Sequence, residues 1–275
     1  MPSTLERPRV SPELYTRDYY GQVEGYRDWD ATHGRRLPPR LARALRLAKL
    51  KPGLRCLDAG AGRGEVVFNC ALAAADAVGI DYSADGVAIA QEALAGYPAG
   101  VRERCQFLQM DVRALQFAAA SFDRVFMLDL VEHLNPEELA MALTEVRRVL
   151  SPGGLLVVHT EPNRNYAELA VRAYESRMLG PLLRPLVRWL TGSAVPFSPY
   201  RDSMHVNEQS PASLRQALTA AGFRPRVWCS GLYGIEELRD PRSVLKRLLF
   251  TGWPLSSLGP LANTLCINVW AVAER

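Results

Sequence analysis

The chain has 275 residues, and 48% of them are hydrophobic, so it is long enough for one large domain or for a core domain with a substantial insertion. Its net charge of +4 is mild and its Lys and Arg residues form no block, which argues against a dedicated nucleic-acid surface. Five cysteines are scattered without a Cys-x-x-Cys pair, and the first residues contain no apolar signal segment. We therefore expect a cytoplasmic protein with reduced thiols and no membrane span.

The first part of the chain is aromatic and then helical. Residues 1–36 hold four of the ten tyrosines, at positions 15, 19, 20 and 26, and this cluster is expected to bury aromatic area against the core. Residues 37–50 place leucine and arginine at helical spacing and end before Lys51-Pro52-Gly53, which predicts a helix that stops there.

A glycine-rich turn follows at residues 56–64, where an apolar strand reaches Asp58 and glycines stand at alternate positions, 60, 62 and 64. Glycine lets the backbone approach a ligand where any Cβ would collide. The spacing differs from the dinucleotide-binding pattern, in which a pyrophosphate sits on a helix N-terminus. A carboxylate at Asp58 would repel a pyrophosphate, so the turn better suits a ligand that carries an ammonium group.

Several later strands are predicted to end in polar residues. These strands lie at residues 77–81, 105–110, 122–128 and 155–158. Asp81 stands 19 residues after Gly62, close to the offset of about 20 at which an acid meets ribose hydroxyls. Asp111 follows the next strand, and the strand after it runs into a segment, 129–134, that contains two acids and a histidine. Residues 150–154 predict a Pro-Gly-Gly turn before the last of these strands.

The second half of the chain departs from a minimal α/β core. Residues 161–204 contain two amphipathic turns that are broken by proline and carry arginines on one side. The leucine- and arginine-rich stretch 172–190 is either a solvated helix with an apolar core face or a surface for peripheral membrane contact, or for a lipid-like or acidic substrate. The remaining predicted elements are a helix at 211–221, a strand through 227–228, an apolar segment punctuated by proline and glycine at 234–262, and a strand at 265–273.

Over residues 54–160 the order of these elements resembles that of the class I S-adenosylmethionine (SAM) dependent methyltransferases. The resemblance implies an α/β fold, namely a Rossmann-like seven-stranded sheet with an antiparallel last strand, helices on both faces and a helical lid. It also implies four regions, which are an N-terminal aromatic lid segment at 1–36, a SAM-binding core at 37–160, a helical lid insertion at 161–204, and a C-terminal part of the sheet at 205–275 with a variable substrate segment at 234–262.

The resemblance also assigns cofactor contacts. The implied residues are Asp58, Gly60, Gly62 and Gly64 at the methionine end, Asp81 at the ribose, Asp111 and Val112 at the adenine, and Tyr82, Leu128 and Tyr20 against the cofactor. In many family members an N-terminal segment folds over the methionine end, so closing the pocket is a second role for Tyr19, Tyr20 or Tyr26 beside core packing, and we favour it. The product left by the cofactor would be S-adenosylhomocysteine.

A metal site is one interpretation of the segment after the fourth strand. Asp129, Glu132 and His133 stand at i, i+3 and i+4, so their side chains share one face if Asp129 begins a helical turn. Two carboxylates and an imidazole, with His205 as a fourth ligand, suit a divalent ion that would activate an acceptor hydroxyl. The pattern is similar to the acid-x-x-Glu-His motif of ubiquinone-biosynthesis O-methyltransferases and of small-RNA 2′-O-methyltransferases, with Asp129 in place of a first Glu.

A metal-free interpretation stands beside it, because Glu-His-Leu is a frequent helix start in this superfamily. His133 would then be a general base or a hydrogen-bonded helix-start residue, and His205 would pack against the lid. Glu132, His133 and His205 are the candidate catalytic residues, and His159 is a further base candidate or a packing residue at a strand end.

We therefore predict a SAM-dependent methyltransferase for a small, hydrophobic acceptor such as a secondary metabolite, with oxygen as the favoured acceptor atom. The alternatives are transfer to carbon or nitrogen, and a SAM-binding protein with a cyclase-like or structural role. Methylation of nucleic acid rests on the metal motif alone, and the glycine spacing and Asp58 oppose an NAD-dependent dehydrogenase. The oligomeric state stays open.

Overall fold

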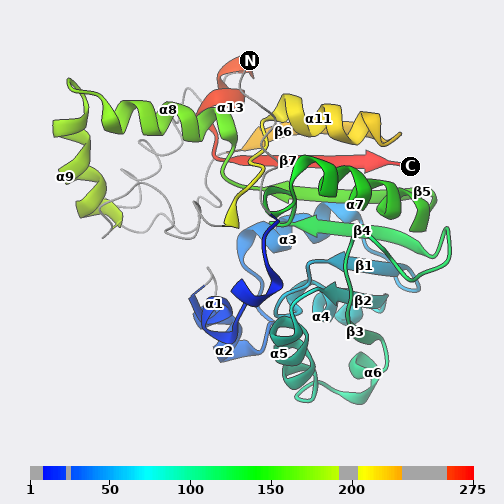
Figure 1. Cartoon of the computed structure of the whole chain (residues 1–275). Coiled ribbons are helices and arrows are strands. Elements are labelled where there is room, and N and C mark those ends of the chain that lie inside the picture. The colour runs from blue at the N-terminus through cyan, green and yellow to red at the C-terminus, as the bar shows by residue number, and fades with distance from the viewer. Residues whose placement is uncertain (1–8, 23–25, 192–203, 231–258) are drawn as a thin grey trace.

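The computed structural model of the protein describes residues 9–22, 26–191, 204–230 and 259–275. They form a seven-stranded sheet in the order β3-β2-β1-β4-β5-β7-β6, with helices on both faces (Figure 1). The strands are β1 (Arg55–Ala59), β2 (Asp76–Asp81), β3 (Cys105–Gln109), β4 (Phe122–Leu128), β5 (Leu150–Thr160), β6 (Arg224–Ser230) and β7 (Asn268–Glu274). The first five strands are parallel, whereas β7 pairs antiparallel with β5 and β6. The predicted Rossmann-like sheet is confirmed.

The inner strands are buried on both faces, and their side chains alternate between two cores. Along β4, Val125 and Met127 belong to one core and Phe126 to the other. The helices that carry these cores are α3 (Pro39–Ala48), α4 (Glu65–Leu72), α5 (Ala84–Leu94), α7 (Pro136–Val149) and α11 (Pro211–Ala220). α7 and α11 cover the first core, and α3, α4 and α5 cover the second. Strands between two helical layers are therefore apolar on both faces.

Helix starts fix the loops at the carboxyl ends of the strands. Ser83 caps α5, because its hydroxyl accepts a hydrogen bond from the Gly86 N–H at the start of that helix. α7 begins with a capping box in which Asn135 and Glu138 each bond the other's backbone N–H. The short 3-10 helix η2 (Val131–His133) directly precedes that cap, so the acid-histidine segment is held between β4 and α7.

Two predicted strand boundaries differ from the structure. Strand β5 runs through the predicted Pro-Gly-Gly turn, because Phe122 pairs with Leu150 while Arg124 pairs with Leu155, so the extra residues form a bulge. Strand β7 begins at Asn268 rather than at residue 265, because a helix, α13 (Gly259–Leu265), takes up the preceding residues.

The N-terminal residues lie at the edge of the sheet where the parallel strands end (Figure 1). They form η1 (Pro12–Leu14), α1 (Arg17–Gln22) and α2 (Tyr26–Thr32). Elsewhere, the short helix α6 (Ala99–Arg102) lies between α5 and β3 in the chain. The Ser83 hydroxyl donates to the Tyr15 carbonyl at 2.7 Å, and the Arg17 N–H donates to Asp85 at 3.0 Å. We call residues 9–22 the strap, because these bonds fasten it to the start of α5.

The helical insertion is represented by α8 (Arg164–Glu175) and α9 (Gly180–Thr191). Of the predicted substrate segment, residues 234–258 lie outside the described residues, and the rest is part of α13. The four region boundaries remain a prediction. Within the described ranges, no helix combines the length and the hydrophobicity that crossing a bilayer demands.

Candidate active site

A cavity opens at the carboxyl edge of the parallel strands, beneath the strap. Nine of the residues predicted for the cofactor line it, namely Tyr20, Asp58, Gly60, Gly62, Asp81, Tyr82, Asp111, Val112 and Leu128. They come from the strap, from the turn after β1 and from the ends of β2, β3 and β4, as ligand binding outside the carboxyl ends of an open α/β sheet requires. Gly64 is not among the lining residues.

The glycine turn is shaped by close contacts within the protein as well as by the cavity. Gly60, Gly62 and Gly64 all have positive φ, which favours glycine. A Cβ at Gly62 would lie 3.3 Å from the ring of Tyr20. A Cβ at Gly64 would lie 2.8 Å from Phe107 and 2.9 Å from Phe68, so this glycine serves core packing rather than the cavity that the sequence predicted for it.

Three carboxylates are buried at the methionine end that the sequence predicted. Asp58 is only 4% exposed, and Glu65 and Asp81 are buried beside it. Arg63 is paired with Glu65 at 2.8 Å. Burial, and then repulsion from Glu65 and Asp81, raises the pKa of Asp58 well above its ordinary value. A bound ammonium group would relieve this repulsion, so the donor set fits the amino acid end of SAM.

Asp81 orders the neighbouring turn. One oxygen accepts the Gly62 N–H at 2.9 Å and the Tyr20 hydroxyl at 3.4 Å, and the other accepts the Ser83 N–H at 2.9 Å. Burial raises the pKa of Asp81, although these hydrogen bonds oppose the rise. Tyr20 is itself fixed, because Arg63 donates to its carbonyl at 3.1 Å.

The ring of Tyr20 explains a second glycine, in α5. A Cβ at Gly86 would lie 2.7 Å from the Tyr20 hydroxyl oxygen. Tyr19 also lines the cavity, whereas Tyr26 stacks on Trp29 and is not among the residues of that lining. Of the three tyrosines expected to close the pocket, the structure therefore places two at the cavity.

Two arginines that were not predicted from the sequence lie at the end of the cavity that was predicted for the adenine. Arg113 Nε donates to both Asp111 oxygens, at 2.8 and 3.0 Å, and Arg9 of the strap reaches Asp111 at 3.3 Å. Partial burial would raise the pKa of Asp111, but the hydrogen bonds from Arg113 hold it below its ordinary value. Arg9 and Arg113 also pair with Glu138 of α7. Of these contacts, only the one between Asp111 and Arg113 had a signal in the sequence, which is their spacing of two residues.

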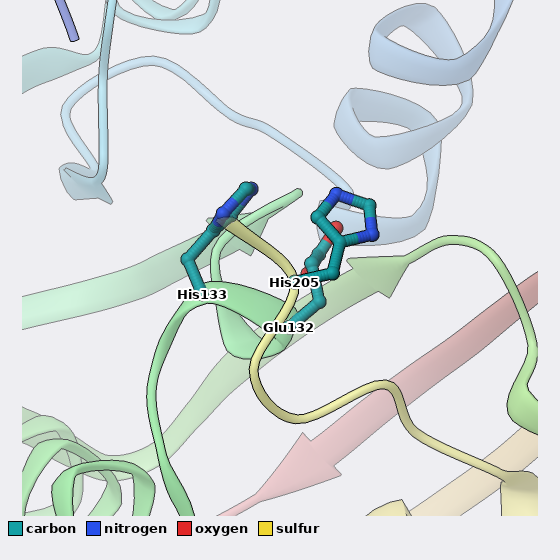
Figure 2. Close-up of side chains that lie close together, drawn as sticks. All are labelled: Glu132, His133 and His205. Atoms are coloured by element: carbon teal, nitrogen blue, oxygen red, sulfur yellow. The ribbon is translucent and has the colours of Figure 1, made fainter. Parts of the chain in front are cut away.

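Glu132, His133 and His205 come together as the sequence predicted (Figure 2). One ligand atom from each lies within 4.8 Å of the others. The backbone N–H groups of Val206 and Asn207 both donate to the Glu132 carbonyl at 3.0 Å, which brings the segment that carries His205 onto η2. The Glu132 carboxylate also accepts the Thr160 hydroxyl at 2.8 Å. His133 lines the cavity, whereas Glu132 is buried behind it.

The protonation state of His133 favours the binding of a metal ion. His133 Nδ1 lies 3.1 Å from the Met204 carbonyl, which can only accept, so Nδ1 carries the proton and Nε2 keeps a lone pair. Burial, with His205 nearby, lowers the pKa of His133 to about 3, so the imidazole is neutral. Burial, and then repulsion from Asp129, raises the pKa of Glu132 to about 7. Two imidazoles and a carboxylate are a donor set that a divalent cation accepts.

Asp129 takes a different position from the one predicted. It does not begin the helical turn, because its φ is +55° and η2 starts only at Val131. The structure does not bring Asp129 into the group of three. Its carboxylate instead accepts Arg40 Nε at 2.8 Å and a short hydrogen bond from His159 Nδ1.

His159 is held as a cation rather than as a base. Its Nε2 lies 2.8 Å from the Asn268 side-chain oxygen, so with Nδ1 on Asp129 both ring nitrogens face acceptors. Burial alone would lower the pKa of His159, but the Asp129 carboxylate raises it above its ordinary value. Burial would likewise raise the pKa of Asp129, but His159 and Arg40 hold it well below its usual range.

These features define the chain as an α/β protein with an acid-lined cavity at the carboxyl edge of its sheet. The sequence profile of the family described as "Methyltransferase domain" matches residues 56–154. A demethylmenaquinone methyltransferase from Thermus thermophilus is 34% identical over 190 residues, which are 67% of this chain and 80% of that protein. A ubiquinone biosynthesis O-methyltransferase from Sinorhizobium medicae is 34% identical over 225 residues, which are 81% of this chain and 73% of that protein.

A solved structure agrees with the fold. A chain in the complex between the Haloferax volcanii Trm112 methyltransferase activator and a methyltransferase matches with a TM-score of 0.61 and 16% identity, over 97% of this chain and 98% of that one. The protein belongs to the class I SAM-dependent methyltransferase family, and it is a SAM-dependent methyltransferase enzyme.

Proposed function

We propose that the protein transfers a methyl group from SAM to an oxygen atom of a small, apolar acceptor, with assistance from a divalent ion held by Glu132, His133 and His205. The observation that carries this proposal is the meeting of these three side chains beside the cofactor cavity, with His133 Nε2 left as a lone-pair donor. The relative named a ubiquinone biosynthesis O-methyltransferase supports oxygen as the acceptor atom and a quinone-like acceptor.

The cofactor supplies an activated methyl group when it is bound. In our proposal Asp58 binds its ammonium group, Gly60 and Gly62 let the backbone approach it, and Asp81 orients the ribose. Asp111 and Val112 would face the adenine, with Leu128 and Tyr82 beside the nucleoside. Tyr20 closes the cavity, and the enclosure aligns the acceptor and excludes water, which is the main task of a protein in an in-line displacement.

A divalent ion, when bound, makes an acceptor hydroxyl more acidic. Glu132, His133 and His205 would hold it, and the segment 204–207 keeps His205 in place through its bonds to the Glu132 carbonyl. If no metal is needed, His133 Nε2 is the atom placed to take the acceptor proton, because it keeps a lone pair and His133 lines the cavity, but its lowered pKa makes it a weak base. Asp129 has a supporting role in either case, since its carboxylate is already held by Arg40 and His159.

Metal content and SAM affinity test this proposal together. We expect the purified protein to retain about one equivalent of divalent metal after supplementation and dialysis, and His205→Ala and Glu132→Gln to lose it. His33→Asn is the matched control, because His33 is exposed and its left-handed backbone suits asparagine. SAM should bind all four proteins, and S-adenosylhomocysteine release should be screened with catechols and vicinal diols. Tight SAM binding without metal under every supplementation would contradict metal assistance and leave His133 as the base.

A further inference from the structure

The helical insertion forms an arm that leaves the sheet at its carboxyl edge. Helix α8 begins four residues after β5 ends, and Figure 1 shows it projecting away from the sheet, with α9 at its outer end. We call residues 164–191 the arm. It starts at the same edge of the sheet as the cofactor cavity, so whatever binds the arm lies on the same side of the molecule as that cavity.

The outward face of α9 is apolar. Val187 is buried, and Leu183 and Leu186 are half-buried, so these residues form the inner face of the helix. Leu182 is 72% exposed and Trp189 is 52% exposed, and they stand at i and i+7, on the same outward face. At the tip of the arm, just before α9, Met178 is 78% exposed. These are among the most exposed large apolar side chains of the described residues, and such patches mark interaction sites.

The charge on the same surface has one sign. Between residues 176 and 191 the sequence contains arginines at positions 177, 184 and 188 and no Asp or Glu. All three arginines are exposed, and Arg184 lies over the ring of Tyr174 at 5.7 Å. Among the residues that the structure describes, Arg177 and Arg188 make no ion pair with a carboxylate. The arm therefore presents leucine, methionine and tryptophan beside arginines, two of which, Arg177 and Arg188, no carboxylate of the described residues neutralises.

This combination matches the interface of an anionic bilayer. Amphipathic helices that lie in the headgroup region carry arginine on the polar side and tryptophan or leucine on the buried side. Anionic headgroups attract such cationic segments, and tryptophan prefers the boundary between headgroups and acyl chains. A globular partner protein would instead have to fit a narrow, convex helix tip.

We propose that the arm binds the surface of a bilayer that contains anionic lipids. Met178, Leu182 and Trp189 enter the headgroup boundary, and Arg177, Arg184 and Arg188 contact lipid phosphates. Binding in this way turns the carboxyl edge of the sheet, and with it the cofactor cavity, toward the membrane. This inference does not depend on which atom the enzyme methylates or on the metal.

Co-sedimentation of the purified full-length protein with vesicles tests the proposal. The protein should sediment with vesicles of equimolar phosphatidylglycerol and phosphatidylcholine, and not with phosphatidylcholine alone. The double variant Arg177→Glu, Arg188→Glu should lose binding by at least roughly 25-fold, at about fivefold for each arginine. Arg102→Glu, on α6 at a distance from the arm, is the matched charge control and should bind as the parent does.

The apolar contribution is tested by Leu182→Gln against Met141→Ala, which changes a comparably exposed side chain on α7. Leu182→Gln should weaken vesicle binding, and Met141→Ala should not, with thermal unfolding of each variant confirming that it is folded. The proposal is overturned if the folded parent does not sediment with anionic vesicles, or if Arg102→Glu weakens binding as much as the arm variant does. Self-association of the protein through the same residues without lipid binding, seen by sedimentation velocity, would also overturn it.

Discussion

At the scale of single residues, the buried Asp58 carboxylate lowers the stability of the ligand-free protein when it is ionised. Its carboxylate is buried near two other carboxylates, and these surroundings raise its pKa. When the pKa of an acid is higher in the folded than in the unfolded state, the free energy of unfolding falls as pH rises above the unfolded pKa, which is about 3.9 for Asp. The free protein is therefore strained at neutral pH at the place where the proposed ammonium contact forms.

The substitution Asp58→Asn should therefore raise the stability of the free protein and lower its affinity for SAM. At pH 7 we expect the free variant to unfold at a higher temperature than the parent, because a buried charge has gone. Its SAM affinity should fall by roughly 10- to 100-fold, because a charge-assisted contact has gone. In the parent, affinity should rise as pH increases through the raised pKa of Asp58, and in the variant this rise should be absent. Calorimetric titration of SAM into both proteins over a pH series measures these affinities. The same pH dependence in both proteins would contradict the proposed contact between Asp58 and the ammonium group.

Single residues also show where sequence reasoning reaches its limit. Asp58, Asp81 and Asp111 could be predicted because each stands at or near the end of a strand, so their position depends on local pattern alone. Asp129 could not, because its role is set by Arg40, 89 residues earlier in the chain, and by a backbone turn with positive φ. An i, i+3, i+4 spacing predicts a shared face only if the backbone is helical from its first residue.

At the scale of elements, the turn between β1 and α4 joins cofactor binding to core packing. Gly60 and Gly62 face the cavity, while Gly64 is the N-cap of α4 and lies against Phe68 and Phe107. The three glycines look equivalent in the sequence, because their spacing is regular. Only the packing of aromatic rings from α4 and β3 shows that the third has a different function.

Gly64→Ala should therefore destabilise the fold through two effects. Alanine at φ +88° costs about 1–2 kcal/mol, and its Cβ overpacks the two phenylalanines at a cost of about 1–3 kcal/mol. Gly53→Ala is the matched control, because Gly53 has φ +79° and no atom within 4 Å of an added Cβ. Urea unfolding should give a total loss of roughly 2–5 kcal/mol at Gly64 and only the backbone part at Gly53. Equal losses would show that packing at Gly64 is loose.

At the scale of the whole molecule, one buried polar network ties the parallel and antiparallel parts of the sheet together. Asp129 follows β4, His159 lies in β5, Asn268 begins β7 and Arg40 lies in α3. Their side chains form a continuous chain of hydrogen bonds from the helix layer to the last strand. The protonated state of His159 therefore affects global stability.

We expect this network to give a defined pH dependence of unfolding. His159 has a raised pKa, so its contribution is fully present below the unfolded pKa of about 6.5 and is lost as pH rises through the folded pKa. Asp129 has a depressed pKa, so its contribution is present above about 3.9 and is lost as pH falls. The pair is thus most stabilising between these values.

The variant His159→Gln isolates the histidine. Relative to it, the parent should lose up to about 1.4 kcal/mol of unfolding free energy per pH unit above 6.5. Chemical unfolding at a series of pH values from 6 to 9 measures the difference. If the difference in unfolding free energy between the parent and the variant stays constant over this range, the pKa of His159 is the same in the folded and unfolded states and the prediction is wrong.

The sheet itself could be predicted from sequence almost completely, because strands, turns and helix caps are encoded in short segments. The strap was predicted as part of an N-terminal aromatic lid segment, but its attachment was not, since it depends on contacts such as that between Arg17 and Asp85, which are far apart in the chain. The arginines on Asp111 and the cationic state of His159 depend on three-dimensional neighbours in the same way. Local pattern thus gives the scaffold and the acids at its strand ends, and tertiary contacts decide their charge.

The ring of Tyr20 has a consequence for how related sequences can diverge. Gly86 does not have a positive φ, and the three atoms nearest to its missing Cβ all belong to Tyr20, with the hydroxyl oxygen at 2.7 Å and the ring carbon Cζ at 3.0 Å. A chain with a small residue at position 20 is free to carry alanine at position 86, with a gain of up to about 1 kcal/mol in helix propensity. Positions 20 and 86, which lie on different elements, are therefore expected to change together in evolution.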